Sequence, residues 1–231
     1  MTVLELFSGT ECISNEFRRR GAECFTIDWD VKFPSSMHCD IGELHIEDLP
    51  EKFRHPDVVF MAPDCRTYSL AAIYRHRKKN PETGNLDPVT EDAKMCDRVN
   101  VHALELLAEL NPKVWWIENP RACLQKMTWM VPLDPYKHLI TYCQYMKDVP
   151  VEERRMKPTN LWTNIPNPPL LPPCTLNSKC HPSTPRGSQK VGTPGLKNAT
   201  ERSVYPHQLV EAIVDITIDY INSQVPNNAE T

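Results

Sequence analysis

The first half of the chain alternates short apolar runs with amphipathic segments. Four runs rich in β-branched and aromatic residues have the length and composition of buried strands: residues 2–7, 23–27, 58–62 and 113–117. Between the first two runs, residues 11–20 place Ile13 and Phe17 on one helical face, and Gly21 closes the segment. This repetition of strand, helix and strand predicts an α/β fold with a mostly parallel sheet.

Two longer periodic segments predict helices, and two polar segments interrupt the pattern. Residues 91–110 carry apolar side chains on one face, and residues 206–218 form a second amphipathic run that closes the domain. Residues 70–90 are polar and structure-poor, which is typical of a mobile functional loop or a disordered segment. From residue 158 to residue 206 the composition shifts to Pro, Asn, Ser, Thr and Lys. The predicted organisation is a core at 1–157, a proline-rich insertion at 158–200, a closing helix at 201–222 and a flexible tail at 223–231.

Residues that can carry chemistry follow several of the predicted strands. Cys65 lies in the loop after the third run, and Glu118 follows directly after the fourth. Asp28 ends the second strand, about 20 positions past the turn at Gly9, and a residue so placed binds the ribose of adenosine in βαβ units. Residues 38–41 are the end of a further short strand. Because ligands bind at the carboxyl edge of open α/β sheets, Cys65 and Glu118 should open into one crevice.

Length, charge and cysteine content narrow the class of protein. The 231 residues suit one domain of ordinary core size. A net charge of −4 provides no general attraction for nucleic acid, so a polyanion would have to meet the local basic clusters at 18–20 and 75–79. Nine scattered cysteines with no signal peptide before them favour a reducing compartment. No apolar run approaches the ~18–20 residues of a membrane span, so we expect a soluble, cytoplasmic protein.

The proline-rich segment contains three residues of metal-binding type, Cys174, Cys180 and His181. Together they could supply three ligands to a zinc ion. Their spacing fits no standard zinc knuckle, and the neighbouring sequence offers no evident fourth ligand. We therefore predict no metal site from the sequence.

Several segments of the chain stand in the order of the motifs of one family. They are Leu4-Glu5-Leu6-Phe7-Ser8-Gly9, Asp28-Trp29, Asp40-Ile41, Pro63-Asp64-Cys65-Arg66-Thr67-Tyr68-Ser69, Glu118-Asn119-Pro120 and Glu201-Arg202-Ser203 with Pro206, Gln208 and Leu209. Through these segments, over residues 1–145 and 198–220, the chain resembles the DNA cytosine 5-methyltransferases. The likeness is greatest to the small forms typical of phages and mobile elements.

The resemblance implies a Rossmann-like methyltransferase fold and methyl transfer to carbon 5 of cytosine in DNA. Carbon 5 is a weak nucleophile, so a Cys65 thiolate would first add to carbon 6 of the base. Glu118, kept protonated by a raised pKa, would contact N3 of the base. Asn119 would orient the loop, and Arg155 would provide a cationic contact to the base or to the thiolate.

The resemblance also implies a cofactor and partners. The methyl donor would be S-adenosylmethionine, bound by Phe7, Ser8, Gly9, Asp28, Trp29, Asp40, Ile41 and Pro63. Within this set Phe7 and Trp29 would lie against the adenine, and Asp28 would bind the ribose. Double-stranded DNA is the implied substrate, with the target base flipped into the Cys65 pocket and the 70–90 loop closed over it. The short 165–197 segment would take the place of the target-recognition region; we expect a monomer, with a cognate restriction nuclease as a further candidate partner.

Two departures from the family pattern leave other interpretations open. Asp64 replaces a proline beside the nucleophile, where a carboxylate raises the thiol pKa unless it points away or pairs with Arg66. Glu11 and Cys12 replace two glycines of the first motif, and Glu11 falls where the carboxylate of the cofactor would approach. One alternative is a non-catalytic DNA-binding relative with a degraded cofactor site. Another is a cysteine-dependent enzyme that modifies a pyrimidine in RNA or in a nucleotide.

Overall fold

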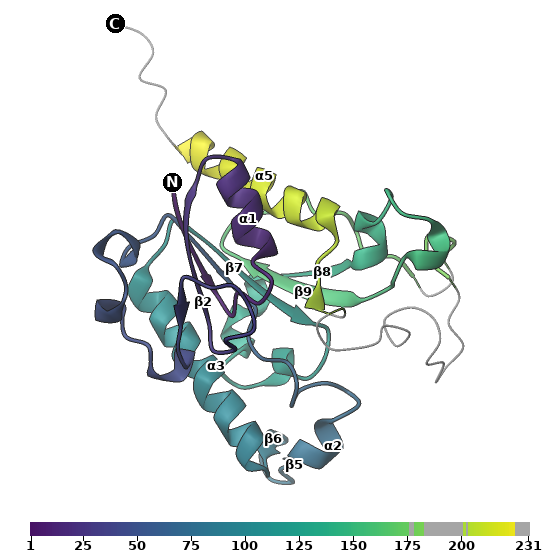
Figure 1. Cartoon of the computed structure of the whole chain (residues 1–231). Coiled ribbons are helices and arrows are strands. Elements are labelled where there is room, and N and C mark those ends of the chain that lie inside the picture. Colours follow the sequence, from purple (N-terminus) through teal and green to yellow (C-terminus); the bar gives the residue numbers. More distant parts are fainter. Residues whose placement is uncertain (176–177, 183–200, 202, 225–231) are drawn as a thin grey trace, which may run out of the picture.

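One seven-stranded sheet forms the centre of the protein (Figure 1). The computed structural model describes residues 1–175, 178–182, 201 and 203–224. In sheet order the strands are β3 (Met37–His38), β2 (Glu23–Asp28), β1 (Thr2–Leu6), β4 (Val58–Met61), β7 (Val114–Pro120), β9 (Pro158–Thr163) and β8 (Lys137–Thr141). The first five are parallel to one another, and β9 is antiparallel to both of its neighbours. The sheet is therefore mostly parallel, as the sequence predicted.

Helices cover both faces of the sheet and make a three-layer arrangement. On one face, α1 (Cys12–Arg19) and α5 (His207–Gln224) lie side by side, and α3 (Glu91–Leu110) covers the other (Figure 1). Alternation along β4 shows why both faces are apolar: Val58 and Phe60 pack in the α1–α5 layer, whereas Val59 packs in the α3 layer. These layers confirm the predicted α/β class with a mostly parallel, Rossmann-like sheet.

The predicted elements and the observed ones agree to within a few residues. The α3 helix begins after Thr90, whose hydroxyl accepts a hydrogen bond from the Ala93 N–H, and it ends at Asn111 in the left-handed conformation. The closing helix begins at His207, one residue after the start of the periodic run but six residues after the predicted boundary at 201, and it runs on to Gln224. Single turns of 3-10 helix connect the other elements: Ile41–Glu43, Ile46–Asp48, Glu51–Phe53, Leu124–Lys126, Val131–Tyr136, Tyr142–Tyr145 and Val151–Glu153. None of the described helices combines the length and the apolar character that a membrane crossing needs.

The 70–90 segment is structured, contrary to the prediction. It forms the short helix α2 (Ile73–His76) and a hairpin of β5 (Arg77–Lys79) and β6 (Leu86–Pro88). The hairpin is held to α3 by Arg77, whose side chain is fully buried and forms an ion pair with Asp97 at 2.6 Å. The Arg77 guanidinium also lies 4.0 Å from the centre of the Tyr68 ring. The side chain of Arg77 is therefore committed to the fold and is not placed to meet a phosphate.

The predicted boundary between core and insertion also changes. Residues 158–163 form β9, an inner strand hydrogen-bonded to β7 and β8, so they belong to the sheet and not to an insertion. Leu161 and Trp162 are fully buried there. The sequence also suggests a turn that enters a strand here, but only the pairing with β7 and β8 shows that it is an inner strand of the sheet. Residues 176–177, 183–200 and 225–231, which include most of the predicted insertion and tail, lie outside the described residues.

We predict that Arg77→Met lowers the free energy of unfolding by about 3 kcal/mol, because the Asp97 carboxylate then loses its buried cation. Lys78→Met in the same strand, where the side chain is exposed, is the matched control and should change stability by less than about 0.5 kcal/mol. Urea unfolding monitored by tryptophan fluorescence measures both. Equal stability of the two variants would contradict the structural role given to Arg77.

Candidate active site

The register of the parallel strands brings the predicted site residues to one edge of the sheet. Leu6 of β1 is paired with Ile27 of β2 and with Met61 of β4, and Met61 is paired with Ile117 of β7. The residues that come next along each strand therefore lie side by side at the carboxyl edge: Phe7, Asp28, Ala62 and Glu118. This edge is the place where open α/β sheets bind ligands.

Cys65 is a half-buried thiol four residues past the end of β4. Burial raises its pKa to about 11, and the negative charges of Glu118 and Asp64 add to the rise, whereas Lys157 opposes it. The thiol is accordingly protonated at neutral pH in the protein alone, and it needs a cation or a bound substrate to become a thiolate. Asp64 pairs with Arg66 at 2.9 Å, which is one of the two arrangements that we expected to be tolerable beside a nucleophile.

Glu118 is a buried carboxyl held by two tyrosines. Tyr142 donates a hydrogen bond to its Oε1 at 3.1 Å, and Tyr205 donates one to its Oε2 at 3.2 Å. Burial raises the pKa of Glu118, and this effect is larger than the opposing effects of Lys157 and the two tyrosines. The carboxyl group is thus suited to remain protonated and to donate a hydrogen bond to a buried acceptor.

Lys157 is the cation that the structure places beside Cys65 and Glu118, and our sequence analysis did not select it. Its Nζ atom lies 4.0 Å from Glu118 Oε1 and donates to the Tyr142 hydroxyl at 3.3 Å. The side chain is 12 % exposed. The sequence offered one local signal, because Lys157 directly precedes the residues that form β9. Only the antiparallel direction of β9 brings the start of that strand to the active edge.

Arg155, the predicted cationic contact, is directed elsewhere. Its Nη1 and Nη2 donate to the backbone carbonyls of Glu201 and Val204 at 2.8 and 2.7 Å. These bonds hold the chain just before Tyr205, whose hydroxyl reaches Glu118. Arg155 is therefore a positioning residue for this wall of the site, and the structure does not direct its guanidinium to Cys65.

Asn119 connects β7 to the loop that carries Cys65. Its Nδ2 donates to the Pro63 carbonyl at 2.8 Å, in a buried contact. The bond holds the backbone two residues before the nucleophile, and it fits the loop-orienting role that we expected of Asn119. The Pro63 carbonyl keeps a second lone pair after this bond.

The turn between β1 and α1 is shaped by three residues with positive φ: Phe7, Gly9 and Glu11. The Gly9 N–H donates to Asp28 Oδ2 at 2.8 Å, which ties the turn to the end of β2. A Cβ atom added to Gly9 would meet no described atom within 4 Å, so the turn opens onto free space. A ligand can approach this backbone closely, which is the use that βαβ units make of such a turn.

Glu11, the most serious departure from the family pattern, is turned toward the protein. Its carboxylate pairs with Arg18 of α1 at 3.2 Å and accepts a hydrogen bond from the Thr26 hydroxyl. With its side chain held there, Glu11 is 8 % exposed. Its left-handed backbone costs a side-chain-bearing residue about 1 kcal/mol relative to glycine. The substitution is accommodated by these partners of the carboxylate.

The other predicted cofactor residues lie near the same edge but differ in exposure and in hydrogen bonding. Asp28 accepts backbone N–H bonds on both oxygens, and each oxygen keeps a second lone pair. Trp29 is 65 % exposed, so its ring is free to stack on a ligand. Asp40 caps a 3-10 turn through the Gly42 N–H, and Ile41 is buried in the core. Ser8 is buried and its hydroxyl lies 3.0 Å from that of Ser35.

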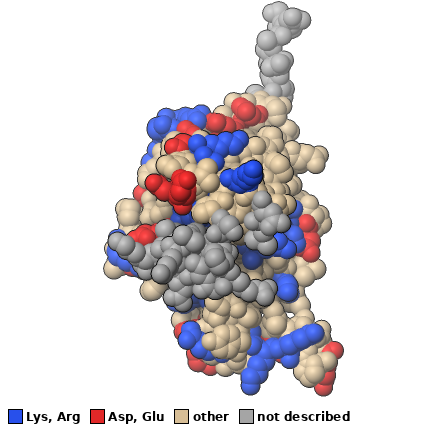
Figure 2. Space-filling view, turned by 90° about the vertical axis from the view of Figure 1, so that its right-hand side faces the viewer, with Lys and Arg blue, Asp and Glu red and all other residues tan. Residues whose placement is uncertain are grey.

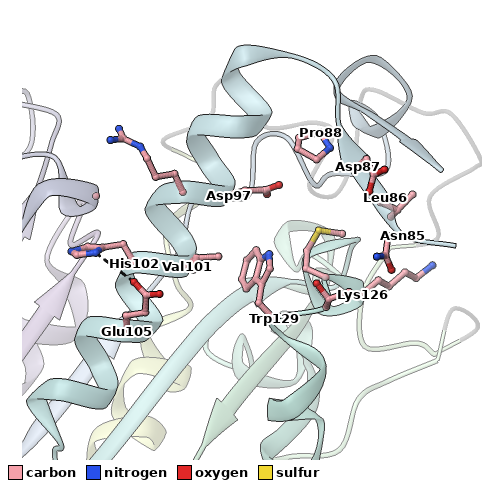
Figure 3. Close-up of a pocket in the computed structure, with 14 residues that line it drawn as sticks. Asn85, Leu86, Asp87, Pro88, Asp97, Val101, His102, Glu105, Lys126 and Trp129 are labelled. Atoms are coloured by element: carbon pink, nitrogen blue, oxygen red, sulfur yellow. Dashed lines mark ion pairs between the residues drawn. The ribbon is translucent and has the colours of Figure 1, made fainter. Parts of the chain in front are cut away.

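A cavity of about 520 Å³ borders this edge at Gly42 and Arg98, which both contact Asp40 (Figure 3). Its walls come from α3, from the segment around β6 and from residues 126–129, and Trp129 and Lys126 are among the lining side chains (Figure 3). None of the predicted site residues lines it. Cys65 and Glu118 therefore lie outside this cavity, which adjoins the predicted site only at Asp40.

We predict that alkylation of Cys65 by iodoacetamide accelerates about tenfold per pH unit from pH 7 to pH 10, because a pKa of about 11 keeps the thiolate a minor species throughout. A cysteine with an ordinary pKa would level off near pH 9. Lys157→Met should slow the reaction several-fold and Asp64→Asn should accelerate it, because they remove opposite charges.

Peptide mass spectrometry resolves Cys65 from the other eight cysteines. Lys137→Met, which removes a surface ion pair with Asp134, is the matched control and should leave the rate unchanged. A rate that levels off below pH 9 in the parent protein would contradict the electrostatics assigned to Cys65.

The chain is similar to known methyltransferases. It is 28 % identical over 233 residues to the probable DNA (cytosine-5)-methyltransferase of Frog virus 3 (isolate Goorha). The match covers 94 % of this chain and all of the viral protein. No protein-family model matches the chain. Two of the similar solved structures are the Dnmt2 methyltransferase of S. pombe (16 % identity, TM-score 0.46, 70 % of this chain and 50 % of that one) and EhMeth of Entamoeba histolytica (13 %, 0.47, 72 % and 53 %).

The chain spans about half the length of these solved structures, whereas it matches the viral relative from end to end. Over 94 % of its length, the chain is therefore similar to a probable DNA (cytosine-5)-methyltransferase.

Proposed function

We propose that the protein transfers a methyl group from S-adenosylmethionine to carbon 5 of cytosine in double-stranded DNA through a covalent Cys65 adduct. The observation that carries the proposal is the placement of Cys65 and Glu118 at the carboxyl ends of the adjacent strands β4 and β7. The name of the full-length viral relative supports DNA cytosine as the substrate class.

The residues of the site are suited to the steps of this reaction. The Cys65 thiol loses its proton, and its sulfur bonds to carbon 6 of the base, which moves an electron pair toward carbon 5. Burial raises the pKa of Glu118 and so favours its protonated form, in which the carboxyl would donate to N3 and stabilise the charge that develops on the ring. After methylation, carbon 5 gives its proton to water, and the electron pair of that C–H bond re-forms the double bond to carbon 6. The bond between carbon 6 and sulfur breaks and releases the Cys65 thiolate, which takes a proton from water to restore the thiol.

Lys157 supplies a positive charge that favours the thiolate over the thiol. The same ammonium lies beside the carboxyl of Glu118, where it opposes the rise in pKa. The two effects have opposite consequences for the reaction. The cation favours the reactive thiolate of Cys65, but it also favours the ionised form of Glu118, which cannot donate to the base. A base bound over Cys65 would separate these groups from water and strengthen both interactions.

The residues at the β1 and β2 ends fit S-adenosylmethionine. The open space beside Gly9 allows a ligand to approach the turn, the exposed Trp29 ring can stack on an adenine, and Asp28 retains lone pairs for ribose hydroxyls. When bound, this cofactor supplies an electrophilic methyl group. Glu11 does not oppose this fit, because its carboxylate is paired with Arg18.

The segment after Cys65 has the character of a DNA-facing surface. Leu70 and Tyr74 are 72 % and 80 % exposed, which is unusual for large apolar side chains. The basic residues Arg75, Lys78 and Lys79 are exposed next to them. Lys and Arg side chains gather at the lower end of the molecule in Figure 2, the level at which Figure 1 places α2 and the β5–β6 hairpin. Apolar side chains can fill the space of a flipped base while cations bind phosphates.

Calorimetry with S-adenosylmethionine tests the cofactor site. We expect micromolar affinity, on the order of −8 kcal/mol, for the parent protein, and a loss of at least about tenfold in Trp29→Ala and in Phe7→Ala. Trp29→Ala is the cleaner variant because the side chain is exposed and contributes little to the core. Tyr136→Ala, at another exposed aromatic residue, is the control and should bind as the parent does. A folded parent protein that does not bind would remove the cofactor from the proposal.

Trapping with DNA that contains 5-fluorocytosine tests the covalent step. Fluorine cannot leave as a proton does, so in the presence of S-adenosylmethionine we expect a stable adduct at Cys65, detected by gel shift under denaturing conditions. Cys65→Ser should abolish the adduct, and Cys39→Ser, a thiol outside the site, should retain it. Retained DNA affinity without an adduct would favour a non-catalytic DNA-binding protein, and an adduct formed only with RNA or a nucleotide would favour a different pyrimidine substrate.

A further inference from the structure

Three cysteines and one histidine from two distant parts of the sequence meet at one point, beside the site but not part of it. Cys143 lies in the 3-10 turn after β8, and Cys174, Cys180 and His181 come from the proline-rich segment. One ligand atom from each residue, sulfur or imidazole nitrogen, lies within 4.8 Å of all the others. Cys143 is the fourth ligand that the sequence did not reveal, because it lies 31 residues before Cys174.

Three of the distances between the donor atoms are close to those of a tetrahedral metal site, and none of the six exceeds 4.8 Å. Zinc bound to sulfur at about 2.3 Å and to nitrogen at about 2.0 Å places its ligand atoms about 3.5–3.8 Å apart. Cys180 Sγ lies 3.7 Å from Cys143 Sγ and 3.4 Å from His181 Nδ1, and Cys174 Sγ lies 3.6 Å from the same nitrogen. The pair Cys143 and Cys174 is closer, at 3.0 Å, which is still far longer than a disulfide bond of about 2.05 Å.

The surroundings also suit bound thiolates. The Ser178 hydroxyl donates to Cys180 Sγ at 3.1 Å, and the Gln144 amide lies 3.9 Å from the same sulfur. The backbone N–H of Cys174 donates to the Thr141 hydroxyl at 2.9 Å, which fastens the segment to the end of β8. Donors around the sulfur atoms and a fixed backbone are the features that orient the ligands of metal sites.

The choice of metal follows from the donor set. Three sulfurs and one imidazole are soft ligands of the kind that zinc takes in closed, four-coordinate structural sites, whereas magnesium and calcium take oxygen ligands. His181 is 7 % exposed and Cys143 1 % exposed, so these two donors are withdrawn from water. Four protein ligands leave no open position for a substrate, which separates this site from catalysis.

We propose that the protein binds one structural zinc ion through Cys143, Cys174, Cys180 and His181. The ion fastens the proline-rich segment to the turn after β8. Tyr142, the residue before Cys143, donates its hydroxyl hydrogen to Glu118, so the zinc site also fixes the backbone that carries one wall of the active edge. The proposal rests on this cluster alone and does not depend on the proposed methyl transfer.

The full chain, purified without chelators, is the protein to test. Elemental analysis and native mass spectrometry should find one zinc per chain, and X-ray absorption should find three sulfurs at about 2.3 Å and one nitrogen at about 2.0 Å. Cys180→Ser and His181→Ala should lower the zinc content at least about tenfold, since losing one of four ligands weakens such sites strongly. Cys39→Ser, a half-buried thiol outside the cluster, should keep one zinc.

X-ray absorption of the parent protein identifies the zinc ligands directly. The test therefore does not depend on whether the variants fold. A folded parent protein that contains no zinc and takes up none from added zinc chloride would overturn the proposal. So would a bound zinc with a ligand set other than three sulfurs and one nitrogen, or a disulfide between Cys143 and Cys174 found by peptide mapping in place of the metal.

Discussion

The antiparallel pairing of β9 with β7 is the constraint on which the active edge depends. The neighbour of β7 on its other side, β4, ends at Met61, and its chain turns into the loop that carries Cys65. With β9 as a partner, β7 continues for three more residues, through Glu118 to Pro120. The carboxyl of Glu118 and the amide of Asn119 therefore stand beyond the end of β4, beside the nucleophile loop. A sheet without β9 would let β7 end earlier and leave this loop without support.

The same pairing explains the electrostatics of the site. Because β9 runs in the opposite direction, its start lies at the carboxyl edge and brings Lys157 to Glu118 and Cys65. Two tyrosines complete the enclosure: Tyr142 from the end of β8 and Tyr205 from the approach to α5. One buried carboxyl, one thiol and one ammonium thus share a small region where each charge changes the protonation of the others. Such mutual perturbation is typical of catalytic sites.

The departures from the family pattern are resolved by contacts that lie outside the motifs. Asp64 is paired with Arg66, and the carboxylate of Glu11, just before α1, is paired with Arg18 in the last turn of that helix. The motif residues alone suggested a weakened site, because a motif records which residue types are present and not where their side chains turn. In both cases an arginine nearby in the sequence pairs with the carboxylate: Arg66 with Asp64 and Arg18 with Glu11.

The sequence by itself determined the local elements and the nucleophile loop, because strand and helix periodicity and the turn residues act over a few positions. It located β1, α1, α3 and the closing helix to within a few residues, and it brought Cys65 and Glu118 to the same edge. Only the tertiary structure decided the roles of Lys157, Arg155 and Cys143, and it alone showed β9 to be an inner strand. Their contacts join residues tens of positions apart, and such contacts depend on strand order and direction, which no local pattern records.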